Sequence, residues 1–276
     1  MRLGCNHNNT IKIPQPDHSR KRPMTKTDPF DISDMILTKP GTIVDSETLL
    51  RNTQTRIWAS LKKDYRYKGV PDNSTKFLRQ NVFKKFNAVV LYVDLVGSTE
   101  IALGLPYEKL AIIMGAFAQE MASTVDHHGG LLLKFMGDAI IAYFVPSKRV
   151  HFTADQAVRC AKSMSLVISE GINPILSQYD YPELHVRMGM DYGTNIVVRY
   201  GSDPKLSHVD LMGRSMNMAS KIQSVANADQ LLVGEDVYKL LHPRLQEEFE
   251  IVVWKDINWK YRSLDTGNLY KVYALK

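Results

Sequence analysis

Two aspartates follow apolar runs of the sequence, at places where a carboxylate could hold a metal ion bound to phosphate. Asp94 comes directly after AVVLYV, a run typical of a buried strand, and shortly before Gly97-Ser98-Thr99. Asp138 follows Gly137 at the tip of a hairpin expected within LLLKFMGDAIIAYF. If the two strands are neighbours in a sheet, the carboxylates emerge close together, which is tolerable when they share divalent cations.

A pair of metal ions about 3.5–4 Å apart can activate an attacking oxygen and stabilise a leaving phosphate. The loop after the first strand supports that chemistry, because Gly97 lets the backbone approach a phosphate and Ser98 or Thr99 could cap the following helix. A plainer interpretation stays open for each aspartate: Asp94 merely caps that helix, and Asp138 occupies a turn that favours aspartate. The two together favour the metal site.

The elements that would position these residues follow from the apolar pattern. A strand is expected over 88–94, and two more on either side of 136–138. A long helix is expected over 106–127, and a second over 154–176. The order β-α-β-β-α-β, with further elements behind it, predicts an α+β fold of ferredoxin-like (βαββαβ) type, in which helices cover one face of the sheet.

Two further predictions concern the later part of the chain. HVRMGMDYGTNIVVRYG is interpreted as strand, turn and strand, with Asp191 and Gly193 in the turn. MGRSMNMASKIQSVA is interpreted as a helix, and the residues spaced for one face are Met212, Met216, Ala219 and Ile222. Short strand and helix patterns continue as far as VYAL.

The beginning of the chain is basic, whereas the rest is slightly acidic. Lys and Arg number 17 against 8 Asp and Glu up to Asn87, and 18 against 21 after it, within a total net charge of +6. Residues 1–44 are expected to form a basic, disordered arm, and residues 45–86 a helical extension of a domain at 87–276. The arm is interpreted as solvated. Contact with an anionic membrane surface is the alternative, and no motif suggests a nucleic-acid partner.

The extension is expected to contain two helices. Asp45 or Ser46 could cap the first, whose apolar side would carry Leu49, Ile57, Trp58 and Leu61. A shorter helix is expected over 75–85. Together they are interpreted as a regulatory or dimer-supporting element.

The overall composition is that of an ordinary globular protein, with 44% hydrophobic and 23% charged residues. No apolar run approaches the roughly 18 residues needed to span a bilayer, and the polar N-terminus lacks the apolar core of a signal peptide. Cys5 and Cys160 lie far apart, which argues against a disulfide framework. The protein is therefore expected to be cytoplasmic.

Four segments, taken in order, resemble the motifs of class III nucleotidyl cyclases, the adenylate and guanylate cyclases. They are VVLYVDLVGSTE, GGLLLKFMGDAIIAYF, VRMGMDYG and HVDLMGRSMNMASKIQ. The resemblance covers roughly residues 87–276 and is closest to the stand-alone cyclase-domain proteins of prokaryotes. It implies that Asp94 and Asp138 bind two divalent cations, Mg²⁺ or Mn²⁺, and that Leu95 contributes a backbone carbonyl.

The resemblance also assigns the base. Lys134 and Asp210 match the family's base-selecting pair, in which the lysine donates to a ring nitrogen and the aspartate accepts from an exocyclic amine. That pattern suits adenine, and guanine presents the reverse. ATP is therefore the expected substrate, with cyclic AMP and pyrophosphate as products. GTP or a pyrimidine nucleotide remains the alternative.

Two positions match the family residues that contact ribose and phosphate. Asn217 matches the asparagine that orients the ribose, and Lys221 stands where the family usually has an arginine that stabilises charge on the reacting phosphate. Lysine supplies the charge without the bidentate fork, so transition-state support could be weaker. This departure keeps open a catalytically degenerate nucleotide sensor. Lys260 is the candidate for holding the terminal phosphates, with Lys255 and Arg262 as rivals.

The implied reaction is an in-line attack of the ribose 3′-oxygen on the α-phosphorus, which needs no nucleophile from the protein. In the family, one subunit supplies the metal-binding aspartates and the other supplies the residues for base and ribose. Because this chain has both sets, the resemblance implies a head-to-tail homodimer with two composite sites.

Overall fold

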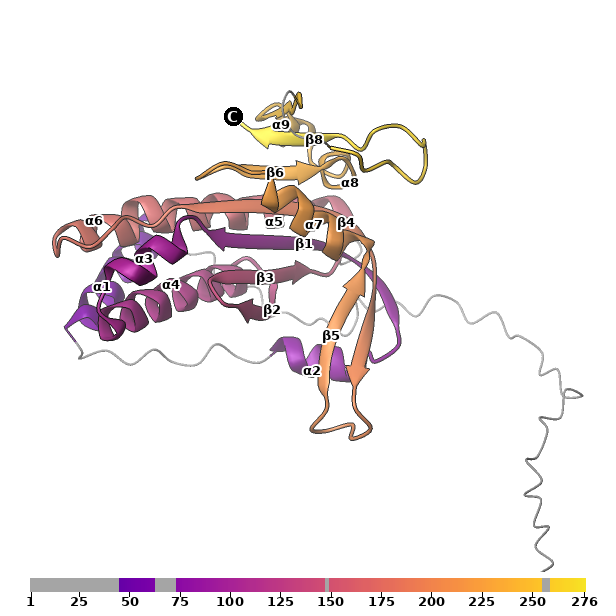
Figure 1. Ribbon diagram of the computed structural model, residues 1–276. Coiled ribbons are helices and arrows are strands. Elements are labelled where there is room, and N and C mark those ends of the chain that lie inside the picture. The colour runs from indigo at the N-terminus through magenta and orange to yellow at the C-terminus, as the bar shows by residue number, and fades with distance from the viewer. Residues whose placement is uncertain (1–44, 63–72, 147–148, 255–258) are drawn as a thin grey trace, which may run out of the picture. The chain divides into compact units, whose positions relative to one another are not determined.

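The protein is described by a computed structural model that covers residues 45–62, 73–146, 149–254 and 259–276 (Figure 1). The basic arm predicted for residues 1–44 and the rival phosphate ligand Lys255 lie outside the described residues.

An eight-stranded sheet runs through the described residues, with the strand order β2-β3-β1-β4-β6-β8-β7 and with β5 paired to β4. Strand β1 is antiparallel to both β3 and β4, whereas β4 and β6 are parallel. The strands are β1 (Lys85–Leu95), β2 (Leu131–Met136), β3 (Ala139–Phe144), β4 (Val186–Tyr200), β5 (His208–Gly213), β6 (Leu231–Gly234), β7 (Phe249–Ile251) and β8 (Val272–Leu275).

Helices alternate with these strands in the order expected for the βαββαβ core. They are α1 (Ser46–Leu61), α2 (Asn73–Gln80), α3 (Ser98–Gly104), α4 (Tyr107–His127), α5 (Val150–Leu166), the π-helical turn η2 (Val167–Ile172), α6 (Asn173–Ser177), α7 (Arg214–Ser224), α8 (Glu235–Tyr238) and α9 (Pro243–Gln246). None of the described helices is long and apolar enough to cross a lipid bilayer.

Strand β1 is buried on both faces, as its continuous apolar run predicts. Val89, Leu91 and Val93 pack into a core with α4 and α5, whereas Ala88 and Val90 pack into a second core with α2, α7 and β5. The α+β fold class is confirmed, but helices cover both faces of the sheet rather than one.

Strand β4 corrects one prediction. The turn expected at Asp191 and Gly193 is wrong, because β4 continues through both and pairs them with Val90 and Ala88 of β1. The buried Asp191 is satisfied by a hydrogen bond of 2.6 Å from the hydroxyl of Tyr270, so a turn-forming residue type is accommodated inside a strand.

Three smaller predictions also differ. Trp58 was expected on the apolar side of α1 but is 45% exposed. The buried positions of α1 include Thr53 and Ser60 instead. Met212 belongs to β5 rather than to the helix and is 52% exposed. The helix expected over 75–85 is α2, which ends at Gln80 because residues from Lys85 onward pair with β4.

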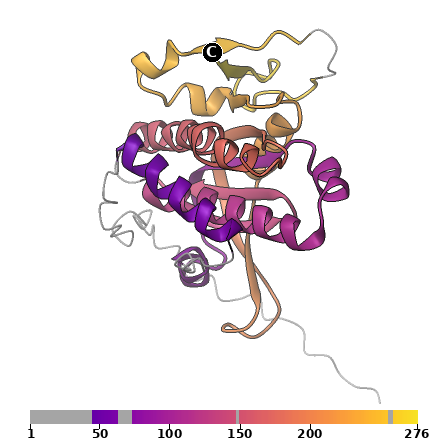
Figure 2. The same cartoon turned by 90° about the vertical axis from the view of Figure 1, so that its left-hand side faces the viewer.

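Helix α1 precedes the segment that carries the recognised motifs, yet it packs on α4, η2 and α6 (Figure 2). Its N-cap is Asp45, whose side chain accepts a hydrogen bond from the backbone of Thr48. Arg56 donates to both carboxylate oxygens of Glu120 on α4, at 2.7 and 2.5 Å, and Thr53 donates to the same group at 2.9 Å. The carboxylate of Glu120, only 1% exposed, is thereby fully paired.

Helix α7 lies directly on strand β4 at Gly189. A Cβ atom at this position would come within 2.2 Å of the backbone nitrogen of Gln223 and 2.6 Å of the carbonyl oxygen of Ala219. The absence of a side chain therefore sets the distance between helix and sheet.

Candidate functional site

The two aspartates of the metal hypothesis lie at the same end of neighbouring strands. The β1–β3 ladder ends at the pair Val93–Ile140; Asp94 is the next residue of β1, and Asp138 lies in the turn before β3. Leu95, whose carbonyl is expected to assist, is the last residue of β1 and is paired with Val186. The strand adjacency that the hypothesis requires is present.

The carboxylate of Asp94 is held by one of its two oxygens. Oδ2 accepts hydrogen bonds from Nε and Nη2 of Arg187, at 2.9 and 2.7 Å, and from Nε2 of Gln223, at 3.1 Å. No hydrogen bond from a described residue reaches Oδ1. The sequence interpretation missed both partners, which lie 93 and 129 positions away along the chain.

Asp138 is partly buried, and the turn before it includes Gly137 with φ 63°. Among the described residues, no group of three or more His, Cys, Asp and Glu side chains is arranged to hold a metal ion. A Mg²⁺ site needs fewer protein ligands, because one or two carboxylates and the phosphates of the substrate complete it. The pair Asp94 and Asp138, with a free carboxylate oxygen, fits such a site.

The loop after Asp94 differs from its prediction in one detail. Gly97 is itself the N-cap of α3, in the left-handed conformation with φ 67°, and no side chain caps the helix. Ser98 and Thr99 therefore belong to the first helical turn and do not cap it. The left-handed φ explains the glycine, because other residues adopt it at a cost.

Lys134 on β2 and Asp210 on β5, the two residues of the base-selecting hypothesis, contact each other. The ammonium nitrogen of Lys134 lies 2.5 Å from Oδ2 of Asp210, and the two side chains are 30% and 14% exposed. The two residues are 76 positions apart in the chain. They come together because β5 and β2 both contribute side chains to the second core. One oxygen of Asp210 also accepts from the backbone of Leu211.

Tyr92 stands beside this pair and was not singled out from the sequence. It lies opposite Ile141 of β3, which in turn lies opposite Lys134 of β2, so the three side chains share a row on one face of the sheet. Burial and the carboxylate of Asp210 both raise the pKa of the Tyr92 hydroxyl. The phenol is thus close enough to the pair to respond to its charge.

The comparison with protein families decides the assignment. The model of the adenylate and guanylate cyclase catalytic domain matches residues 82–276. The chain belongs to this family of class III nucleotidyl cyclases.

Curated relatives of the cyclase include enzymes named for pyrimidine bases. It is 27% identical over 155 residues to the cytidylate cyclase of Escherichia coli, covering 54% of this chain and 34% of the relative. It is 26% identical over 191 residues to the uridylate cyclase of Rhodovulum sp. (strain MB263), covering 64% of this chain and 75% of the relative. The chain therefore spans about a third of the first relative and three quarters of the second.

Solved structures support the fold. The guanylyl cyclase Cya2 superposes with a TM-score of 0.59 at 22% identity, covering 70% of this chain and 93% of that chain. The adenylyl cyclase CyaB from P. aeruginosa gives a TM-score of 0.56 at 21% identity, covering 70% and 95%.

Helix α7 of the cyclase carries Asn217 and Lys221 one turn apart, both exposed. Lys260 is exposed too and follows Trp259, which is buried and donates to the carbonyl of Tyr270. Its rival Arg262 donates to the carbonyl of Gly267 within its own loop. The structure brings Lys134 together with Asp210, and shows no comparable contact that joins Lys260 to them.

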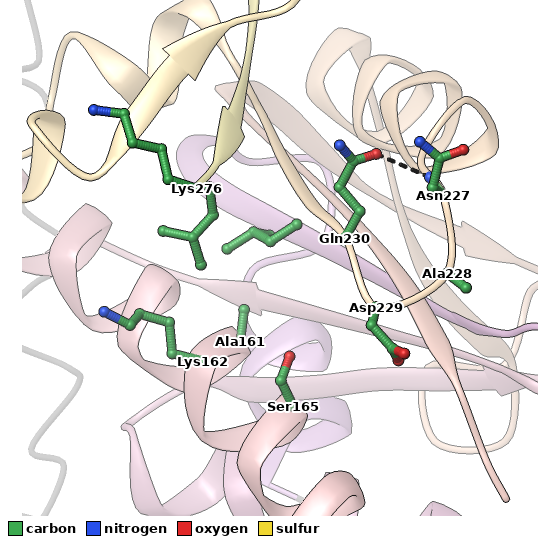
Figure 3. A pocket seen from close by; sticks show the side chains of 10 residues that line it. Ala161, Lys162, Ser165, Asn227, Ala228, Asp229, Gln230 and Lys276 are labelled. Carbon is green, nitrogen blue, oxygen red and sulfur yellow. Dashed lines mark hydrogen bonds between the residues drawn. The ribbon is translucent and has the colours of Figure 1, made fainter.

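A pocket of about 270 Å³ lies elsewhere, between α5 and the loop that leads from α7 to β6 (Figure 3). Its polar lining includes Lys162, Ser165, Asp229 and Lys276. None of the site residues expected from the sequence lines it. Of the predicted nucleotide-binding residues, Lys134 and Asp210 are partly buried, whereas Asn217, Lys221 and Lys260 are exposed.

Proposed function

We propose that this cyclase converts ATP to 3′,5′-cyclic AMP and pyrophosphate. The observation that carries the proposal is the contact of 2.5 Å between Lys134 and Asp210. Lys134 would donate to N1 of adenine, and Asp210 would accept from the 6-amino group. Guanine and uracil present a carbonyl oxygen and a ring N–H at these places, so both would oppose the pair.

Each residue has a defined task in this reaction. Asp94, Asp138 and the carbonyl of Leu95 would hold the divalent cations, which supply the charge that activates the 3′-oxygen and stabilises pyrophosphate. Asn217 would orient the ribose for in-line attack. Lys221 would neutralise charge that develops on the α-phosphate, as a point charge rather than as a bidentate fork.

The active form is proposed to be a head-to-tail homodimer. Asp94 and Asp138 of one protomer would face Lys134, Asp210 and α7 of its partner. Mixing two inactive variants, Asp94→Ala and Lys134→Ala, tests this arrangement, because a heterodimer then contains one intact site. Random exchange would restore about a quarter of the wild-type activity. No recovery in proven heterodimers would contradict a composite site.

CTP is the second candidate, and Tyr92 favours it. Cytosine presents the same acceptor and amine as adenine, at N3 and N4, so the Lys134–Asp210 pair reads both bases. Cytosine also has a carbonyl oxygen at O2 where adenine has a C–H, and the hydroxyl of Tyr92 would donate to it. The cytidylate cyclase among the relatives is consistent with this reading.

The test is a comparison of the four nucleotides. Purified protein is incubated with ATP, GTP, CTP or UTP and with Mg²⁺ or Mn²⁺, and products are identified by mass spectrometry beside Asp94→Ala. The proposal is supported if the wild type forms cyclic AMP and the Asp94→Ala variant forms none. Cyclic CMP would select the second candidate, whereas cyclic GMP or cyclic UMP would refute the base assignment. No product from a folded dimer would favour a nucleotide-binding sensor.

A further inference from the structure

Tyr270 connects the interior of the domain to the loop that carries Lys260. Its side chain is 1% exposed. Its hydroxyl donates to Oδ1 of Asp191 on β4 at 2.6 Å and accepts from the backbone N–H of Asp236 on α8 at 3.0 Å. A tyrosine hydroxyl is both a donor and an acceptor, and both roles are filled here. The far end of the side chain is therefore fixed to two separate elements.

The main chain of Tyr270 holds the residues on either side of Lys260. Its carbonyl oxygen accepts from the indole nitrogen of Trp259 at 2.8 Å, and its backbone N–H donates to the carbonyl of Tyr261 at 2.8 Å. The rings of Trp259 and Tyr261 also pack edge to face, with their centroids 4.8 Å apart. Lys260 itself is exposed. Its backbone is thus held at both neighbours, while its side chain faces solvent.

Helix α7 packs against the same part of the loop. One small core contains residues of both, namely Met218, Ile222, Trp259 and Tyr270. Arg214, the first residue of α7, donates to the carbonyl oxygen of Arg262 at 2.7 Å. Its guanidinium carbon lies 5.5 Å from the centroid of the Tyr270 ring, within the range of a cation–π contact. The helix that carries the proposed ribose and α-phosphate ligands is therefore attached to the loop that carries Lys260.

This attachment matters because two lysines are expected to act on one triphosphate. Lys221 is proposed to act at the α-phosphate, and Lys260 is the candidate for the terminal phosphates. A lysine ammonium binds phosphate as a point charge on a flexible stem. A shift of the backbone of Lys260 relative to α7 should therefore weaken its contact with the terminal phosphates without abolishing it.

We propose that Tyr270 is a positioning residue for the terminal phosphates of the bound nucleotide. Its hydroxyl fixes the stretch of chain that holds Lys260, and its ring keeps that stretch against α7. Tyr270 acts through Lys260 and touches no substrate. The inference deepens the proposed function and rests on it, because it takes Lys260 as the ligand of those phosphates. It holds whichever base is bound.

The test variant is Tyr270→Phe, which removes the hydroxyl and keeps the ring in its core. Asp191→Ala removes the acceptor of the same hydrogen bond, and it replaces Tyr270→Phe if that variant does not fold. Tyr273→Phe is the matched control, because its ring stacks on Tyr238 instead. Lys260→Met, alone and combined with Tyr270→Phe, completes a double-mutant cycle. Each full-length protein is titrated calorimetrically, in buffer with Mn²⁺, with 3′-deoxy-ATP, which lacks the attacking oxygen.

The expected result is a rise of about fivefold in the dissociation constant of 3′-deoxy-ATP for Tyr270→Phe, as the loss of one hydrogen bond predicts. In the Lys260→Met background the same change should have an effect of less than about 1.5-fold, because the residue that it positions is gone. Tyr273→Phe should match the wild type. In parallel assays, the KM for ATP should rise while kcat stays within about twofold.

Three results would overturn the inference: unchanged binding in folded Tyr270→Phe, an equal loss in both backgrounds, or unchanged binding in Lys260→Met. An equal loss would show that the hydroxyl serves only the stability of the fold. If the wild type forms no cyclic nucleotide but the cycle still shows coupling between Tyr270 and Lys260, the proposed function fails while this inference stands.

Discussion

Asp94 and Asp191 lie on the neighbouring strands β1 and β4 and point to the same face of the sheet. Asp94 pairs with Arg187, four residues before Asp191 on the same strand. Asp94 is partly exposed, ion-paired through one oxygen and open at the other. Asp191 is 2% exposed and bonded to the hydroxyl of Tyr270, and burial raises its pKa to about 8. The first can therefore meet a cation, whereas the second is a protonated, neutral group at pH 7.

Glu120 completes the comparison. It is as buried as Asp191, but it keeps its charge partner, because Arg56 and Thr53 together satisfy both oxygens. The charge of the three acidic side chains is thus accommodated in three ways. Asp191 is protonated, both oxygens of Glu120 are paired, and Asp94 is paired through one oxygen while the other stays free. Only the last leaves capacity for a ligand, which is why Asp94 is the functional candidate among them.

The largest effect is expected from the same substitution made at both strands. Asp94→Asn should lower kcat about a thousandfold at saturating Mn²⁺, because an amide oxygen is a neutral and weaker ligand. Asp191→Asn should stay within about tenfold of the wild type, since asparagine still accepts from Tyr270. Rates of cyclic nucleotide formation check both. An equal loss at Asp191 would break the distinction between the two aspartates.

The next effect concerns stability at Glu120. Arg56→Met should lower the free energy of unfolding by about 3 kcal/mol, because it leaves a buried carboxylate without its partner. Urea unfolding at pH 7 measures the change. The double variant Arg56→Met/Glu120→Gln should recover most of the loss, since the glutamine carries no charge. If Arg56→Met lowers the free energy of unfolding by less than about 1 kcal/mol, the Arg56–Glu120 ion pair behaves like a solvent-exposed one.

Asp191 should make stability depend on pH. Its folded-state pKa lies above its unfolded value, so between about pH 4 and pH 8 the unfolded chain has lost a proton that the folded chain retains. Stability therefore falls as pH rises through this window, by roughly 1 kcal/mol per pH unit. Unfolding curves at pH 5, 6 and 7 should show Asp191→Asn gaining on the wild type at each step. A constant difference would contradict the buried, protonated state.

The smallest effect tests the base pocket. Tyr92→Phe should lower the ratio of CTP to ATP turnover, in kcat/KM, by about fivefold, because one hydrogen bond to O2 of cytosine is lost. Competition assays with both nucleotides measure the ratio. Tyr192→Phe is the control, since its side chain packs against the opposite core. An unchanged ratio in Tyr92→Phe would remove the argument for CTP.

The ends of strands were predictable from the sequence, whereas the partners of their side chains were not. The apolar run before Asp94 and the turn before Asp138 are local patterns, and both placements agree with the structure. The meeting of Lys134 with Asp210 was inferred from family resemblance rather than from periodicity. Arg187 and Gln223 gave no local signal, because their contact with Asp94 arises only when β4 and α7 pack on β1.

The error at β4 has a similar cause. Asp191 and Gly193 are turn-forming types, so the local pattern suggested a turn. A tyrosine 79 positions away satisfies the aspartate, and Gly193 pairs with Ala88 within the β1–β4 ladder. Tertiary contacts thus replaced the reasons that normally place these residues in turns.

Gly189 has a consequence for how sequence variation in this cyclase should be interpreted. It touches no substrate in the proposed mechanism, yet any side chain there would lift α7 from β4 and move Gln223, Asn217 and Lys221 together. In a saturation mutagenesis screen scored by cyclic nucleotide output, Gly189 would therefore group with the metal ligands, and a reader without the structure would mistake a spacer for a catalytic position.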